Sequence, residues 1–329
     1  MNSKISHFIF YTLAISLAVV FIWLTIQQTD FDVLKSAAHR ANYFWFAISM
    51  ALSIFSYWLR AARWRLLLDP IGYKIPLSSG FWAIAFAYFM NLTIPRSGEL
   101  ARATSLYKME KVPVDKSIGI IILERVIDLI FLTMFFGLAL LFNADTLISF
   151  LSFADISSFG KIGIAGGIFL GLMLLLYFFR HYWKKLKIYR KIEDFLKGIL
   201  EGFKSIMHLK KRTAFVLYSF AIWLCYFLMT WLVVLAFPET MHFGLGEGFF
   251  LIVSGALGMI LPAVGGLGYP YVMSIAFGAI YLSSGMTIEE GREVGNYFGL
   301  MLYFAQILSM LSFGFLSIYF IAKISKNRK

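Results

Sequence analysis

Long apolar runs separated by short polar segments make up most of the chain. A helix needs about 20 mostly apolar residues to cross the hydrocarbon core of a bilayer. Six stretches meet this requirement, and each is expected to form a membrane-spanning helix: 8–26, 44–62, 118–142, 162–179, 213–236 and 295–322. The pattern therefore predicts an all-α polytopic membrane protein.

Two shorter apolar runs do not fit a single full span. The run 80–94 ends at Pro95 and is followed by a second leg at 99–107, and the run 249–261 ends at Pro262 and is followed by 268–282. Each pair is expected to form a broken or re-entrant helical hairpin. The alternative treats the pairs as thin spans, which gives about eight spans in total on the length that a bilayer requires.

Composition supports this class and excludes several others. The hydrophobic fraction is 60%, above the roughly 45–50% of globular domains. The segment 180–212 is the longest polar one and too short for a soluble domain, so 1–329 is expected to be one transmembrane domain that binds no nucleic acid. Cys225 is the single cysteine and the histidines are dispersed, so neither a metal site nor a cofactor is expected.

The distribution of charge predicts the orientation, because Lys and Arg are retained in cytoplasmic loops. With both termini inside and both hairpins re-entrant, the inner segments carry a net +17 and the outer segments −5, out of a total of +12. The inner set consists of 1–7, 60–79, 108–117, 180–212 and 323–329, and the outer set consists of 27–43, 143–161, 237–248 and 283–294. The segment 180–212 is expected to be a basic, amphipathic cytoplasmic loop on the membrane surface.

The two hairpins share a spacing that indicates an internal repeat. Asn91, Pro95 and Gly98 in the first are separated by four and three residues, as are Gly258, Pro262 and Gly265 in the second. We therefore expect an inverted pseudo-repeat of about 1–142 and 162–322, an architecture found in many transporters. The alternative is chance, since Pro and Gly are frequent in membrane helices. The expected hairpin-tip residues are Pro95, Gly98, Pro262, Gly265, Gly266 and Gly268.

Six charged residues fall at membrane depth, three in the first hairpin and three in the next span, and their formal charges cancel: Arg96, Glu99, Arg102, Glu124, Arg125 and Asp128. Such residues are costly in a bilayer and are usually kept by pairing or by function. In a functional interpretation, the three arginines and Glu99 bind an anionic headgroup, while Glu124 and Asp128 have structural or coupling roles. In the alternative, the six only pair with each other, for example Arg102 with Asp128. No catalytic residue is proposed.

Polar residues at helical spacing in other spans could line the same cavity or only mediate helix packing. They are Ser49, Ser53, Ser56, Arg60 and Arg63; Ser219, Trp223, Tyr226 and Thr230; and Asn296, Gly299, Tyr303 and Gln306. The tip of the second hairpin, in contrast, has no charge. We therefore expect a charged mouth on one side and a glycine-rich gate on the other.

Three sequence elements carry a resemblance to a known family. PRSGELAR at 95–102, ERVIDL at 124–129 and the Pro-x-x-Gly-Gly-x-Gly element at 262–268 resemble the flippase-like transmembrane family that includes the membrane half of lysylphosphatidylglycerol synthase, also called multiple peptide resistance factor. The resemblance implies a multi-pass protein of the bacterial-type inner membrane that moves lipids between leaflets. The synthases continue into an aminoacyltransferase domain, whereas this sequence ends at Lys329, so aminoacyl-lipid synthesis is not expected. Tyr269-Pro270 stand where an acidic residue would be expected, which argues against a paired-carboxylate mechanism.

These observations lead to a functional hypothesis with two alternatives. The chain is expected to translocate an anionic, phosphate-bearing lipid, such as a phospholipid or a polyprenyl phosphate, without being an enzyme. No nucleotide-binding loop is present, so transport would be passive or driven by an ion gradient. The alternatives are a secondary transporter of a small anionic solute and an intramembrane enzyme acting on lipid headgroups. A homo-oligomer is also possible.

Overall fold

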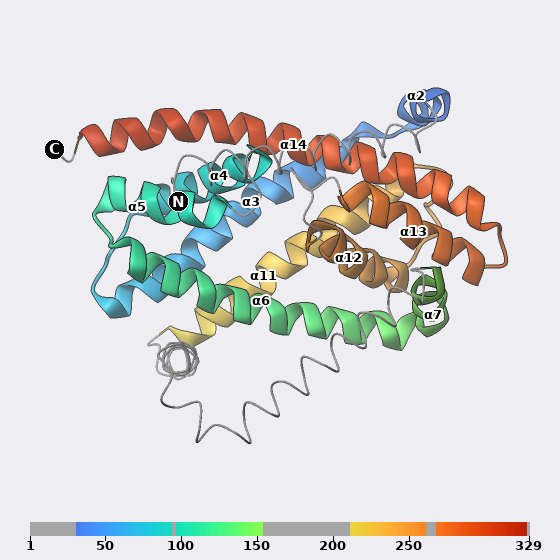
Figure 1. The fold of residues 1–329 in the computed structure, drawn as a ribbon, viewed down its shortest axis with the longest axis horizontal. Helices are drawn as coiled ribbons and strands as arrows, with labels where there is room; N and C mark the ends of the chain where they lie inside the picture. Colours follow the sequence, from blue (N-terminus) through green and yellow to red (C-terminus); the bar gives the residue numbers. More distant parts are fainter. Residues whose placement is uncertain (1–30, 94–96, 154–210, 261–267, 328–329) are drawn as a thin grey trace, which may run out of the picture.

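A computed structural model describes residues 31–93, 97–153, 211–260 and 268–327, and these residues form helices joined by short loops (Figure 1). No strand occurs in these ranges. The protein is therefore of the all-α class, as predicted. The elements are α2 (Phe31–Arg40), α3 (Tyr43–Leu68), η1 (Asp69–Ile71), α4 (Leu77–Thr93), α5 (Gly98–Glu110), α6 (Val114–Phe142), α7 (Ala144–Phe153), α11 (Arg212–Trp231), η2 (Leu232–Ala236), α12 (Leu245–Ile260), α13 (Gly268–Ser283) and α14 (Ile288–Lys326).

Four helical segments of the described chain are long and apolar enough to cross a membrane. They are α3, α6, α11 with η2, and α14, which correspond to the spans expected at 44–62, 118–142, 213–236 and 295–322. Several boundaries lie further out than predicted. α14 begins at Ile288 because the side chain of Thr287 caps it, accepting a hydrogen bond from the backbone N–H of Glu290. Its first turn is polar, so a search for apolar runs places the start of the helix too late.

Two pairs of shorter helices form the expected hairpins. α4 and α5 contain 17 and 13 residues, and α12 and α13 contain 16 each. At 1.5 Å per residue these helices are roughly 20–25 Å long, which is shorter than the roughly 30 Å hydrocarbon core. The legs of each pair pack against each other. Each leg is thus shorter than a full span, and the re-entrant arrangement stays a prediction.

The hairpins occupy opposite halves of the long axis of the molecule (Figure 1). α14 runs along both and packs against α13 in one half and α4 in the other. α3 and α11 lie side by side between them and run in opposite directions, since the backbone N–H of Asn42 donates to the carbonyl of Ala236 where α3 begins and η2 ends. This central pair of helices supports the residues of the site described below.

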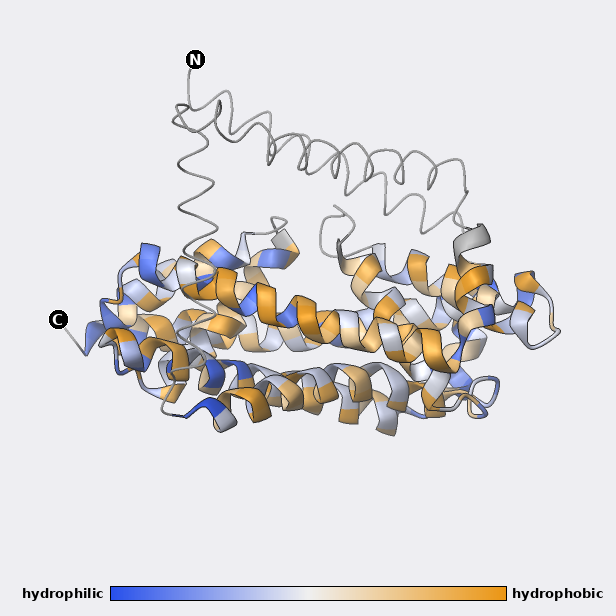
Figure 2. Cartoon of the chain, turned by 90° about the horizontal axis from the view of Figure 1, so that it is seen from below, coloured by the Kyte–Doolittle hydropathy of each residue, from blue (hydrophilic) through white to orange (hydrophobic). Residues whose placement is uncertain are grey.

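The most hydrophilic residues lie mainly towards the two ends of the long axis, and hydrophobic residues predominate along the length between them (Figure 2). The end that contains the C-terminus of α14, here called the basic end, carries Arg65, Lys74, Lys108, Lys111, Lys116, Lys211, Arg212, Lys323 and Lys326. The opposite, acidic end carries Asp32, Asp145, Glu239, Glu247, Glu289, Glu290 and Glu293. Both ends of the α4–α5 hairpin lie at the basic end, and both ends of α12–α13 lie at the acidic end.

Two segments expected to be outer loops contain helices. α2 lies within 27–43 and α7 lies within 143–161. α2 has polar and apolar faces and only Ala37 fully buried, so a search for apolar spans does not detect it. The expected spans 8–26 and 162–179 and nearly all of the loop 180–212 lie outside the described residues. The pseudo-repeat of 1–142 and 162–322 therefore stays a prediction.

Candidate functional site

The most buried charged pair of the predicted set joins the first hairpin to the next span. Arg102 of α5 donates to Glu124 of α6 through Nη1 to Oε2 at 2.5 Å and through Nη2 to Oε1 at 3.3 Å. The Glu124 side chain is completely buried and that of Arg102 nearly so. The guanidinium also stacks 3.8 Å from the ring centroid of Trp64. Arg102 thus pairs with Glu124 rather than with Asp128.

Two further arginines come from α3 and complete the buried network. Arg63 Nη1 donates to Asp128 Oδ1 at 2.8 Å, and Arg63 Nε lies 3.7 Å from Glu124 Oε1. Arg60 Nη2 lies 3.6 Å from Asp128 Oδ2. Two tyrosine hydroxyls accept hydrogen bonds from Arg60 Nη1: Tyr226 at 2.6 Å and Tyr88 at 3.0 Å.

These positions correct the predicted boundary of the inner loop 60–79. The apolar run was expected to end at 62, but α3 continues to Leu68, and its last turns direct Arg60 and Arg63 into the protein. Both side chains are buried, 6% and 0% exposed. They belong to the charged interior, as the polar stripe of this span had suggested, and not to a cytoplasmic surface.

The outer edge of the network is formed by Arg125 and Glu99. Arg125 Nε lies 3.4 Å from Glu99 Oε1, and Arg125 Nη1 lies 3.6 Å from Asp128 Oδ2. The side chains of Arg125 and Glu99 are 48% and 54% exposed, whereas that of Asp128 is 13% exposed. This pair therefore marks the boundary between the buried network and the surroundings.

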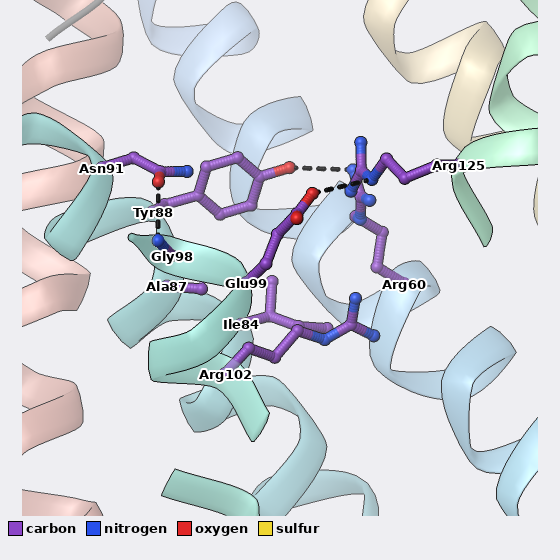
Figure 3. Close-up of a pocket in the computed structure, with 9 residues that line it drawn as sticks. All are labelled: Arg60, Ile84, Ala87, Tyr88, Asn91, Gly98, Glu99, Arg102 and Arg125. Carbon is purple, nitrogen blue, oxygen red and sulfur yellow. Dashed lines mark hydrogen bonds and ion pairs between the residues drawn. The ribbon is translucent and has the colours of Figure 1, made fainter. Parts of the chain in front are cut away.

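A cavity of about 140 Å³ lies against this edge. Its lining combines charged, amide and apolar residues from α3, α4, α5 and α6 (Figure 3): Arg60, Ile84, Ala87, Tyr88, Asn91, Gly98, Glu99, Arg102 and Arg125. In Figure 3 the Glu99 carboxylate points towards Arg125, and the Tyr88 hydroxyl points towards Arg60. Three guanidinium groups and one carboxylate thus border one small space.

The described network carries more positive than negative charge. Arg60, Arg63, Arg102 and Arg125 face Glu99, Glu124 and Asp128, which is four cations against three anions. The six charges that were expected to cancel include Arg96, which lies outside the described residues, and do not include the two arginines of α3, which the structure adds to the network. Arg63 Nε and Nη2 and Arg102 Nε, all buried, make no hydrogen bond within the described part of the chain.

The site lies deep relative to the ends of its helices. Arg60 is eight residues before the end of α3 at Leu68, and Arg125 is eleven residues after the start of α6 at Val114. At 1.5 Å per residue these offsets are roughly 12 and 17 Å. The network therefore lies two or more helical turns inside the ends of both helices.

The first hairpin closes next to the cavity. The backbone N–H of Gly98 donates to Asn91 Oδ1 at 2.8 Å, and Ser97 Oγ donates to the Met90 carbonyl at 2.9 Å. A Cβ at Gly98 would lie 2.3 Å from the Ala87 carbonyl oxygen, so only glycine allows this approach of α5 to α4. Of the other predicted tip and site residues, Gly268 begins α13, whereas Pro95, Arg96, Pro262, Gly265 and Gly266 lie outside the described residues.

The predicted polar stripes contribute unequally to the network. Ser219 and Tyr226 of α11 reach Arg63 and Arg60. Gln306 of α14 donates to Ser49 of α3 at 3.1 Å, which is a contact between helices away from the cavity. Tyr88 and Trp64 were not among the predicted site residues. A tyrosine three residues before Asn91 in an apolar run could have indicated a buried hydroxyl that needs a hydrogen-bond partner.

Comparison with known families identifies the chain. The family model for the lysylphosphatidylglycerol synthase TM region matches residues 9–291. Neither the curated proteins nor the solved structures contain a significant match. The matched range includes both hairpins and every residue of the charged network. The chain belongs to the lysylphosphatidylglycerol synthase transmembrane-region family.

Proposed function

We propose that this membrane protein moves phosphate-bearing lipids of net negative charge between leaflets and holds the phosphate in the cavity beside Arg60, Arg102 and Arg125. The observation that carries the proposal is the surplus of one positive charge in the described part of a network that lies between membrane-spanning helices. An uncompensated buried charge is unfavourable in a medium of low dielectric constant. An anion held beside these arginines lowers this cost.

The residue types suit a phosphate group. Guanidinium groups stay ionised and can donate two parallel hydrogen bonds to phosphate oxygens. The Tyr88 hydroxyl and the Asn91 amide also border the cavity and can donate to ester or headgroup oxygens. Arg96, which precedes Gly98 by two residues in the sequence, is proposed to add a further guanidinium.

The size of the cavity favours a headgroup over a whole molecule. A volume of about 140 Å³ is below the roughly 300–1,000 Å³ that typically encloses a drug-sized ligand. It suits a phosphate with a small polar substituent. The half-exposed edge at Glu99 and Arg125 is where acyl chains would remain outside, in the bilayer.

We further propose that the basic end faces the cytoplasm of a bacterial-type inner membrane, because Lys and Arg are retained on that side. The α4–α5 hairpin would then enter from the cytoplasm, and the glycine-rich hairpin from the outside. The proposal assigns no chemical step to the charged residues, and Glu124 and Asp128 have structural roles in holding the arginines.

The test is lipid translocation by purified protein in proteoliposomes, with fluorescent phosphatidylglycerol and phosphatidylcholine as the two probes. We expect the protein to accelerate movement of phosphatidylglycerol preferentially. Arg125→Gln should remove most of this activity, because it deletes a cavity guanidinium without burying a charge. Lys116→Gln, which removes an exposed charge near the start of the same helix, is the matched control and should behave like the parent.

Two results would contradict the proposal. One is equal translocation by the parent and Arg125→Gln at equal amounts of folded protein. The other is uptake of inorganic phosphate into the vesicles without lipid movement, which would favour the transport of a small anionic solute. Chemical conversion of either lipid would instead indicate an enzyme.

A further inference from the structure

We propose that Glu99 is a resident counter-anion: its carboxylate occupies the place of the ligand's anionic group beside Arg125, and a headgroup binds by displacing it. The inference rests on the proposed function and adds a regulatory element to the same cavity. In this account lipid binding is an exchange of one anion for another on a fixed set of arginines.

Glu99 differs from the other two carboxylates of the network in its surroundings. Glu124 is fully buried and held by Arg102 and Arg63, and Asp128 is held by Arg63, Arg60 and Arg125. Among the described residues, Glu99 has one ion-pair partner, Arg125, at 3.4 Å, and more than half of its side chain is exposed. Among these carboxylates, Glu99 is therefore the one whose release costs least.

The backbone next to Glu99 is fixed, so that only its side chain is free to leave. Gly98 is bonded to Asn91 across the hairpin, and its Cα lies so close to α4 that no Cβ fits. Glu99 is also in the first turn of α5, where the helix dipole favours negative charge. The carboxylate thus occupies a position that is suited to an anion and can vacate it by rotation of its side chain.

The exchange conserves the charge of the site. With Glu99 in place, the network has four cations and three anions, and removal of Glu99 leaves four and two. A phosphodiester carries a single negative charge, so its arrival restores the original balance. The site need never hold the larger positive surplus, which would be costly between membrane-spanning helices.

A consequence follows for affinity and release. Because Glu99 competes with the headgroup for Arg125, it weakens binding, and its return to Arg125 assists the departure of the lipid. A carboxylate that instead bound an ammonium group of the ligand would strengthen binding. The two roles predict opposite effects of neutralising Glu99.

The experiment measures the affinity of the full-length protein in detergent micelles for fluorescent phosphatidylglycerol, with phosphatidylcholine as the reference probe. We expect Glu99→Gln to bind phosphatidylglycerol two- to fivefold more tightly than the parent, the range that partly exposed ion pairs contribute. Its rate of phosphatidylglycerol translocation in proteoliposomes should be lower, because the carboxylate no longer assists the departure of the lipid. Glu289→Gln removes an exposed carboxylate at the acidic end and should leave the affinity unchanged.

Equal or weaker phosphatidylglycerol binding by Glu99→Gln, with a parent that prefers this lipid, would overturn the counter-anion role and leave the proposed function intact. A parent that does not distinguish phosphatidylglycerol from phosphatidylcholine would overturn both. Folding of each variant is checked by its thermal unfolding transition, which the loss of a partly exposed pair should hardly change.

Discussion

Arg102 and Glu124 form a bidentate ion pair that ties the returning leg of the first hairpin to span α6, with both side chains almost completely buried. Trp64 of α3 covers the same guanidinium. Three helices therefore meet at one arginine. The pair holds in position the cavity wall that Arg60, Glu99 and Arg125 share.

Removing one partner of this pair should be strongly destabilising. Glu124→Gln leaves Arg102 buried without its carboxylate, while Arg63 keeps Asp128, and loss of one partner of a buried pair costs about 3–5 kcal/mol. We expect a decrease of this size in the free energy of unfolding, measured by denaturant titration in detergent. Asp115→Asn, at an exposed position on the same helix, should cost less than about 1 kcal/mol. A small effect of Glu124→Gln would show that the pair is not structural.

The turn of the first hairpin should depend on the absence of a side chain at Gly98. In Gly98→Ala the new Cβ would meet the Ala87 carbonyl oxygen at 2.3 Å, so α4 and α5 must separate, at a cost of about 1–3 kcal/mol or more. Gly119→Ala on α6 is the control, because no atom lies within 4 Å of its Cβ position, and it should be neutral or stabilising by up to about 1 kcal/mol. Equal thermal stability of the two variants would refute the close packing of the legs.

The hydroxyl of Tyr226 should contribute to stability through Arg60. Tyr226→Phe removes an acceptor that lies 2.6 Å from Arg60 Nη1, and hydrogen bonds to charged groups contribute about 1.5–3 kcal/mol. Tyr218→Phe, two turns earlier on the same helix, serves as the comparison because it makes an aromatic contact with Trp58 that phenylalanine retains. Unfolding titrations should show a loss for Tyr226→Phe only; the opposite ranking would argue against the network.

The orientation of the two ends can be tested by labelling cysteines. Cys225 is the single cysteine and is buried, so Cys225→Ser provides a background without thiols. In that background Lys74→Cys, at the basic end, should react with a membrane-impermeant maleimide only after the cells are opened. Met286→Cys, at the acidic end, should react in intact cells. The reverse pattern would invert the proposed topology.

The sequence predicted the class of fold well because hydrophobic length is a direct physical requirement of the bilayer. The four described spans and the legs of both hairpins lie where the apolar runs and their proline breaks place them. Boundaries failed where a helix continues through polar residues, as at the start of α14 and the end of α3. An apolar run indicates which residues lie in the lipid, whereas the ends of a helix depend on capping and tertiary contacts.

The site was predicted in part for the same reason. The residues Glu99, Arg102, Glu124, Arg125 and Asp128 were recognisable as charges in apolar surroundings, and the structure brings them together. Their individual ion pairs were not predictable. The spacing of charged residues along one helix does not define which residues of a neighbouring helix they face. The location of Arg60 was equally ambiguous. It stands at the end of an apolar run, and this position is compatible with a cytoplasmic loop as well as with the protein interior.

The central claim, that the surplus charge of the network binds an anionic lipid headgroup, is tested most directly by lipid-dependent thermal stability. A ligand that binds the folded state raises its unfolding temperature. Phosphatidylglycerol added to the purified protein should raise this temperature more than phosphatidylcholine does, and the difference should disappear in Arg125→Gln. Equal stabilisation of the parent and the variant by phosphatidylglycerol would contradict the claim.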